Sequence, residues 1–306
     1  MTEVGGSIPE PDAVQAVNIA VQDISLSGMA GRPGRASPKA LVVALHGGGS
    51  SAGYWDGPAP GQSFVRLALQ LGFAVLALDR PGYGASRDVD PAMLRLSQQV
   101  ETLFDAIDVW SATEGFHGPV CLIGHSVGGI AALMMAANAR GKALAAVDVM
   151  GVPFRYPPGG GDARALLKSG EQGPEPADNL QRRLLFGPDG SFPPEAIAHH
   201  RSCVRPIPLA ELEDGLAAPA IWGRVLPQIA VPVQFTLAEF ETMQCTGWDV
   251  LHEVRALLRR SPAVRVELLL GSGHNASLHH GARAYHLRAL AFFEACIGLA
   301  EAGARR

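Results

Sequence analysis

The chain has 306 residues, of which 47% are hydrophobic and 18% charged, so it holds ample apolar material for a sizeable buried core. Its formal net charge of −4 and the lack of a basic stripe argue against a nucleic-acid-binding protein. The four cysteines include no CxxC pair, which excludes a disulfide framework and a zinc site and suits a reducing cytosol.

The first 14 residues are acidic and rich in Pro and Gly, without the basic and apolar regions of a secretory signal. No apolar run approaches the roughly 20 residues that are needed to span a bilayer. We therefore expect a soluble, cytoplasmic protein that has neither nucleic acid nor membrane as a partner. The sequence does not indicate its oligomeric state.

Short apolar runs alternate with longer helical patterns along the chain. Residues 17–27 alternate weakly in polarity and are typical of an antiparallel edge strand. Continuous apolar runs that end at Gly, Pro or polar residues predict strands buried on both faces, at 42–45, 74–78, 120–123, 145–149, 231–237 and 264–270. Helical patterns follow at 63–71, 94–112, 127–139, 248–259 and 285–300. This alternation predicts an α/β fold with a doubly wound, mostly parallel sheet.

One segment, residues 153–227, breaks the alternation. It is rich in Pro, Gly and charged residues, with short helical pieces at 163–168 and 180–186. A structureless loop of this length is unusual inside a compact domain. We therefore predict an inserted helical cap over residues 153–227, with the core formed by residues 1–152 and 228–306.

The motif with the clearest chemistry is Gly124-His-Ser-Val-Gly128, which places Ser126 between two glycines. An apolar run precedes it and a helical segment rich in Ala and Met follows, which is the strand–turn–helix setting of a nucleophile elbow. Glycines two positions away leave room for the tight turn. The N-terminus of the following helix offers free N–H groups that favour a developing oxyanion. The motif predicts Ser126 as a nucleophile.

With this motif the sequence resembles the α/β-hydrolase family, from about residue 41 to residue 297. Four segments carry the resemblance in the family's order, each after an apolar run: HGGG at 46–49, LDRPGYGAS at 78–86, GHSVG at 124–128 and GHN at 273–275. The resemblance implies an oxyanion hole formed by the N–H groups of Val127 and Gly48, with Gly47 as the alternative donor. It also implies that His46 holds this loop in place and takes no part in the chemistry.

The general base is expected to be His274, which follows the run 264–270 near the end of the chain, as the family's order Ser, acid, His requires. The elbow directs His125 away from the Ser126 hydroxyl, and His279 and His280 read as surface residues. His252-Glu253 lacks the second histidine of a zinc helix, so we expect no metal and no cofactor.

The acid belongs in the loop after the run 231–237. Glu241 occupies the place where the family usually has Asp, and Glu239 the place of a preceding Glu. We favour Glu241 and keep Glu239 as the alternative. Asp148 is a third candidate, because some family members place the acid on the strand after the elbow.

These residues favour an esterase or thioesterase that forms an acyl-enzyme on Ser126 with a small-molecule acyl substrate. An acyltransferase or cyclase would use the same intermediate, and a triad-dependent lyase or a non-catalytic binding protein of the same fold are further alternatives. Apolar cap residues are candidates for an acyl pocket, and for most of them we expect packing within the cap instead: Leu184, Leu185, Phe186, Phe192, Ile197, Val204 and Trp222.

Overall fold

A computed structural model of the protein describes residues 13–34, 37–158 and 180–304. Its centre is an eight-stranded sheet with the order β1-β2-β4-β3-β5-β6-β7-β8. The strands are β1 Gln15–Val21, β2 Ile24–Gly31, β3 Leu41–Leu45, β4 Ala74–Leu78, β5 Val120–His125, β6 Leu144–Met150, β7 Val233–Ala238 and β8 Val264–Leu269. From β4 to β8 all neighbours pair in parallel, so the predicted α/β class with a mostly parallel sheet is confirmed.

The antiparallel edge expected over residues 17–27 is confirmed, and it consists of two strands. The chain forms two antiparallel strands, β1 and β2, and turns between them at Gln22, whose φ is +51°. β2 then pairs antiparallel with β4. The predicted range spans this turn, which explains why its alternation in polarity is weak.

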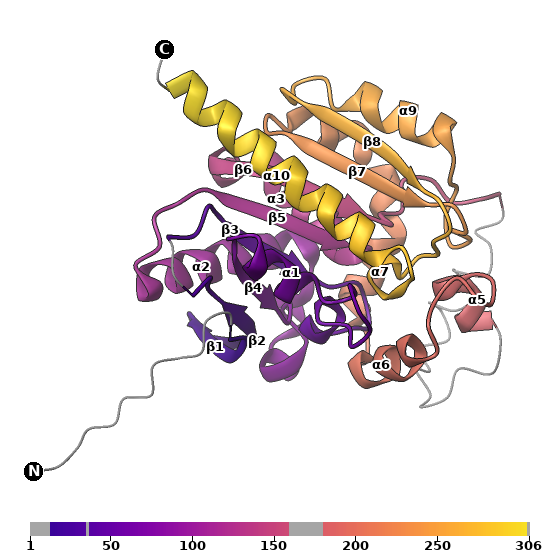
Figure 1. The fold of residues 1–306 in the computed structure, drawn as a ribbon, viewed down its shortest axis with the longest axis horizontal. Helices are drawn as coiled ribbons and strands as arrows, with labels where there is room; N and C mark the ends of the chain where they lie inside the picture. Colours follow the sequence, from indigo (N-terminus) through magenta and orange to yellow (C-terminus); the bar gives the residue numbers. More distant parts are fainter. Residues whose placement is uncertain (1–12, 35–36, 159–179, 305–306) are drawn as a thin grey trace, which may run out of the picture.

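Helices cover both faces of the sheet (Figure 1). They are α1 Phe64–Gln70, α2 Leu96–Glu114, α3 Val127–Ala137, α9 Trp248–Leu257 and α10 Ala282–Ala304. One buried cluster joins the sheet to α2, α3 and α9, and the other joins it to α1 and α10. Strand β3 serves both clusters, because Val43 faces the first and Val42 the second. No helix in these ranges is both long and apolar enough to cross a bilayer.

Between β6 and β7 the chain forms α5 Leu180–Phe186, α6 Glu195–Cys203, α7 Leu209–Ala217 and the short α8 Trp222–Val225. We call residues 153–227 the cap segment. The helical piece predicted at 163–168 lies outside the described residues, whereas the piece at 180–186 coincides with α5. From Ala218 onward the segment packs into the main core cluster through Trp222, Val225 and Leu226.

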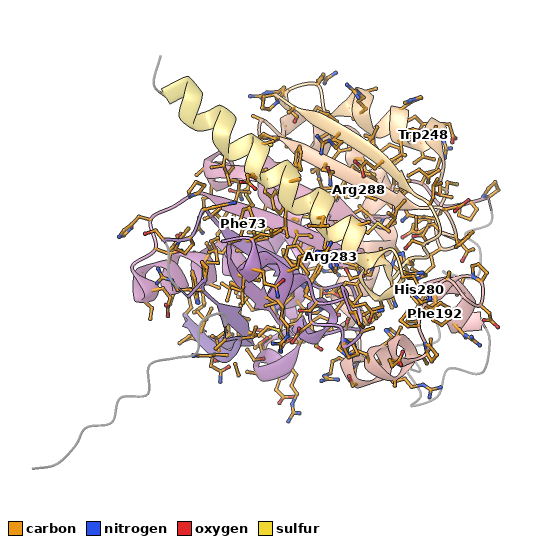
Figure 2. All side chains as sticks on the ribbon, viewed as in Figure 1. Phe73, Phe192, Trp248, His280, Arg283 and Arg288 are labelled. Atoms are coloured by element: carbon orange, nitrogen blue, oxygen red, sulfur yellow. The ribbon has the colours of Figure 1, made fainter. Side chains whose placement is uncertain are left out.

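The cap segment meets the loop after β8 in the region where Figure 2 labels Phe192 and His280. The backbone N–H of His280 donates to the carbonyl of Ser191 (3.2 Å). The neighbouring His279 is buried between Phe186 and Phe192, with its ring centroid 5.9 Å and 5.8 Å from theirs. The expectation that His279 is a surface residue was therefore wrong.

Candidate active site

Ser126 occupies the sharp turn between β5 and α3. Its backbone has φ +52° and ψ −119°, a conformation that a residue with a side chain rarely adopts and that costs about 1–3 kcal/mol. The Ser126 N–H donates to the carbonyl of Met150 at the end of β6 (2.8 Å), which fixes the turn against the neighbouring strand. The sheet therefore maintains the strained conformation of Ser126, and the turn places the serine beyond the carboxyl end of β5.

The two glycines of the motif permit close backbone contacts on either side of the serine. A Cβ on Gly128 would lie 2.3 Å from the carbonyl oxygens of both Leu45 and His46. A Cβ on Gly124 would lie 2.7 Å from the Cα of Gly129. The missing side chain at Gly128 lets α3 start directly against the end of β3, and the missing side chain at Gly124 lets β5 lie against the first turn of α3.

His274 and Glu241 form a buried pair beside this turn. His274 Nδ1 and Glu241 Oε2 are 2.6 Å apart, and the two side chains are 4% and 0% exposed. The N–H of Met243 donates to Glu241 Oε1 (3.1 Å), and Gln244 Nε2 donates to Oε2 (3.3 Å). The carboxylate is thus fixed by its own loop, and it leaves His274 Nε2 as the ring nitrogen free for other chemistry.

His125 is hydrogen-bonded to the backbone of the loop that carries His274. Its Nε2 donates to the backbone carbonyl of His274 (2.9 Å), and its ring stacks on Tyr54 with centroids 4.5 Å apart. Burial, followed by the proximity of His274, holds the pKa of His125 well below its usual value, so the ring is neutral at pH 7. His125 therefore acts on the backbone of the His274 loop.

Neither alternative acid contacts His274. Glu239 is exposed, and its Oε2 accepts a hydrogen bond from the Gly271 N–H (2.7 Å). Asp148 is fully buried on β6, where Gln234 Nε2 donates to its Oδ2 (2.6 Å) and the Tyr285 hydroxyl donates to its Oδ1 (2.9 Å). Of the three acids, the geometry favours Glu241.

The buried Asp148 makes the stability of the protein depend on pH. Burial raises its pKa from 3.8 to about 7, although the hydrogen bonds from Tyr285 and Gln234 oppose this shift. Between these values the folded chain holds a proton that the unfolded chain has lost, so Asp148 stabilises the fold less as pH rises. As pH rises from 5 to 8, the unfolding free energy of Asp148→Asn should therefore increase relative to that of wild type, by roughly 2–3 kcal/mol in all. Urea unfolding across this range measures the difference, and parallel pH curves would contradict it.

The loop after β3, residues 46–49, faces the serine turn. The Gly49 N–H donates to the Tyr83 hydroxyl (3.0 Å), whereas the N–H groups of Gly47 and Gly48 have no hydrogen-bond partner among the described residues. A Cβ on Gly47 would lie 3.2 Å from the Cβ of Ser126, and one on Gly48 would lie 3.1 Å from Val127 Cγ2. Both candidate donors thus lie against the turn, and the structure keeps them as alternatives.

A buried ion pair supports this loop. Arg80 and Glu211 approach to 2.6 Å, and both side chains are 0% exposed. Neither residue stands out from the sequence as a candidate site residue. Arg80 lies within the 78–86 segment that carries the family resemblance, which is a usable signal, but nothing in the local sequence marks Glu211 as its partner.

Ser126, His274 and the glycine loop line one cavity of about 130 Å³ between the core and the cap segment. The structure shows no hydrogen bond between Ser126 Oγ and His274 within the described residues, and such bonds often tighten only when substrate binds. Among the apolar cap candidates, Leu185 and Val204 line the cavity and the other five do not. Further apolar lining comes from Ile207, Leu212, Leu216 and Met243.

The cap segment also brings His200 to the cavity, although its place in a polar stretch of the cap favours solvent exposure over contact with substrate. Asn275 Nδ2 lies 3.4 Å from His200 Nδ1, and burial lowers the pKa of His200 to about 4. His200 is therefore neutral at pH 7. No Asp, Glu, Lys or Arg side chain is among the described residues that line the cavity.

Comparison with known proteins identifies the family of the chain and the proteins that share its fold. The sequence model described as the alpha/beta hydrolase family matches residues 42–286. A thermostable carboxyl esterase from Bacillus coagulans is 17% identical, with a TM-score of 0.67 over 93% of this chain and 99% of its own. A thermophilic esterase from Thermogutta terrifontis is 20% identical, with a TM-score of 0.63 over 90% and 99%.

A thioesterase domain from the curacin biosynthetic pathway is 13% identical, with a TM-score of 0.61 over 91% of this chain and 99% of its own. At these identities the solved structures share the fold, whereas the family match extends over most of the sequence. The chain therefore belongs to the alpha/beta hydrolase family and is a hydrolase.

Proposed function

We propose that this hydrolase cleaves carboxylic esters or thioesters with a short, neutral acyl group, through an acyl-enzyme on Ser126. The observation that carries the proposal is the buried His274–Glu241 pair, 2.6 Å apart, on the same cavity as the strained Ser126 turn. This is the arrangement in which a carboxylate orients an imidazole beside a serine nucleophile.

In the proposed reaction, Ser126 Oγ attacks the carbonyl carbon of the substrate and its proton passes to His274 Nε2. Val127 N–H, with Gly48 or Gly47, stabilises the oxyanion. The bond to the leaving alcohol or thiol then breaks, and His274 returns the proton to that group. Water then attacks the acyl carbon and gives a proton to His274. The bond between the acyl carbon and Ser126 Oγ breaks, His274 returns the proton to Oγ, and the carboxylic acid is released.

Cavity size and charge support the substrate class. A volume of about 130 Å³ is close to that of the engineered cavity of about 150 Å³ that binds benzene, so the space suits an acyl group of about six carbons or fewer. The described lining residues are mostly apolar, and none of them offers a charged side chain to neutralise an ionic substituent. Short neutral acyl chains satisfy both conditions.

A fluorophosphonate probe tests the proposal directly. We expect the probe to label the folded wild-type protein at Ser126, as located by peptide mass spectrometry, and to leave Ser126→Ala unlabelled. We also expect p-nitrophenyl butanoate and the matching thioester to be hydrolysed faster than their dodecanoyl counterparts. Wild-type protein without a label at Ser126 would reject the serine mechanism, and a preference for the longer chain would reject the proposed acyl length.

A further inference from the structure

The carboxylate of Glu211 lies inside the protein although Glu211 belongs to the cap helix α7. It accepts two hydrogen bonds from the Arg80 guanidinium, at 2.6 and 3.0 Å, and a third from Gln99 Nε2 at 2.9 Å. The Tyr83 hydroxyl donates to it at 2.6 Å. A buried charge with this many donors is fully satisfied, so Glu211 has a fixed position relative to the core.

The bond to Glu211 also sets the direction of the Tyr83 hydroxyl. Burial, followed by the charge of Glu211, raises the pKa of Tyr83 well above its usual value of 10.0, so the oxygen keeps its proton. A phenol has one hydrogen to donate, and here it is directed at the carboxylate. The oxygen's lone pairs are then available to the Gly49 N–H, which donates to it at 3.0 Å.

The same network holds the other end of the glycine loop through Arg80. Arg80 Nε donates to the carbonyl of His46 (2.8 Å), and the Arg80 backbone N–H donates to His46 Nε2 (3.1 Å). His46 and Gly49 are therefore both fixed, one on each side of Gly47 and Gly48. A Cβ on Gly48 would lie 3.5 Å from Glu211 Oε1, so the carboxylate also lies directly against the loop.

We propose that Glu211 is a positioning residue for the oxyanion hole: by holding Arg80 and Tyr83 it fixes the loop of residues 46–49 so that a glycine N–H faces the substrate carbonyl. This role rests on the proposed serine hydrolase function. The proposal gives the cap segment a part in catalysis besides covering the substrate. Arg80 and Tyr83 can hold the loop of residues 46–49 in place only while α7 is packed on the core and Glu211 bonds to both of them.

A second tie between α7 and the core provides a matched control. On the surface, Arg95 binds Glu213 (2.7 Å) and Asp214 (2.9 Å), and these residues do not contact the glycine loop. Glu213 is two positions from Glu211 on the same helix and also pairs with an arginine. A variant at Glu213 therefore perturbs the seating of the helix without touching the loop.

The experiment compares Tyr83→Phe, Glu211→Gln and Glu213→Gln with wild type. Tyr83→Phe removes only the hydroxyl, so the loop is tested even if the buried charge left by Glu211→Gln prevents folding. We expect Tyr83→Phe to lower kcat for p-nitrophenyl butanoate, and the rate of Ser126 labelling, by roughly 10- to 100-fold, which is below the loss of a whole oxyanion donor. KM should change by less than about threefold, since ground-state binding does not use the oxyanion.

Hydrogen exchange gives a readout independent of activity. We expect peptides that cover residues 46–49 to exchange faster in Tyr83→Phe, because the Gly49 N–H loses its acceptor. They should also exchange faster in folded Glu211→Gln, because Arg80 and the Tyr83 hydroxyl lose the carboxylate that holds them. Glu213→Gln should match wild type within about twofold in rate and in exchange of this loop.

The outcomes separate the two proposals. If the wild type is labelled at Ser126 but Tyr83→Phe retains its rates and its exchange pattern, the role of Glu211 is wrong and the serine hydrolase function stands. An equal loss in Glu213→Gln would also overturn it, because general seating of the helix would then explain the effect. If the wild type is not labelled, the function is wrong and the loop is no oxyanion hole, even where exchange still shows that Tyr83 orders it.

Discussion

Replacing Glu241 by Gln is expected to lower kcat for an activated ester by about 10⁴-fold, close to the effect of exchanging the acid for an amide in a serine protease. The structure gives the reason. The Met243 N–H requires an acceptor, so the amide oxygen of the substituted side chain would stay with it and the NH₂ group would face His274 Nδ1. A donor there imposes the wrong tautomer, in which His274 Nε2 carries the proton and cannot accept one from Ser126.

Glu239→Gln is the matched control, since it makes the same chemical change two residues away. Glu239 is exposed and its carboxylate accepts a hydrogen bond from the Gly271 N–H, away from His274, so kcat should stay within about twofold of wild type. Ser126→Ala sets the lower limit, at about 10⁶-fold below wild type. Steady-state kinetics with p-nitrophenyl butanoate measures all three. A large loss in Glu239→Gln with a small one in Glu241→Gln would contradict the assignment of the acid.

The parts of the site that follow directly from the sequence are those fixed by local geometry. Ser126 and its flanking glycines were predicted from a strand, a turn and a helix that are adjacent in the chain, and the structure has β5, the turn and α3 in those places. Parallel strands buried on both faces appear as continuous apolar runs, so the core of the sheet was also predictable. The weak signal at residues 17–27 indicated the antiparallel edge but not its division into two strands, because alternation cannot be followed across a turn.

The parts that the sequence does not disclose depend on contacts between distant segments. Glu211 is 131 positions from Arg80, and it reads as an ordinary helical glutamate until the fold places it inside the protein. His279 was expected at the surface because the sequence places it at the start of a helix, yet Phe186 and Phe192 of the cap segment cover it. Where a cap folds over a core, burial is decided by a partner that the local sequence does not contain.

Among changes that affect stability, Gly128→Ala is expected to be the most severe. Ala is the better helix former, and Gly128 lies in the first turn of α3, so propensity alone would favour the variant by about 1 kcal/mol. The new Cβ would instead lie 2.3 Å from two carbonyl oxygens of the central strand and its loop. Backbone atoms of a central strand cannot give way cheaply, and we expect a net loss of about 3–5 kcal/mol in unfolding free energy.

Gly223→Ala is the matched control, because Gly223 is also helical, in α8, and a Cβ there would meet nothing within 4 Å. Urea unfolding should show it unchanged or stabilised by up to about 1 kcal/mol. If Gly128→Ala behaves like Gly223→Ala, the close packing of α3 on β3 is wrong. That contact matters beyond stability, because it fixes the distance between Val127, at the start of α3, and the loop of residues 46–49, which follows β3. The glycine that lets the helix approach the strand thereby brings together the two halves of the proposed oxyanion hole.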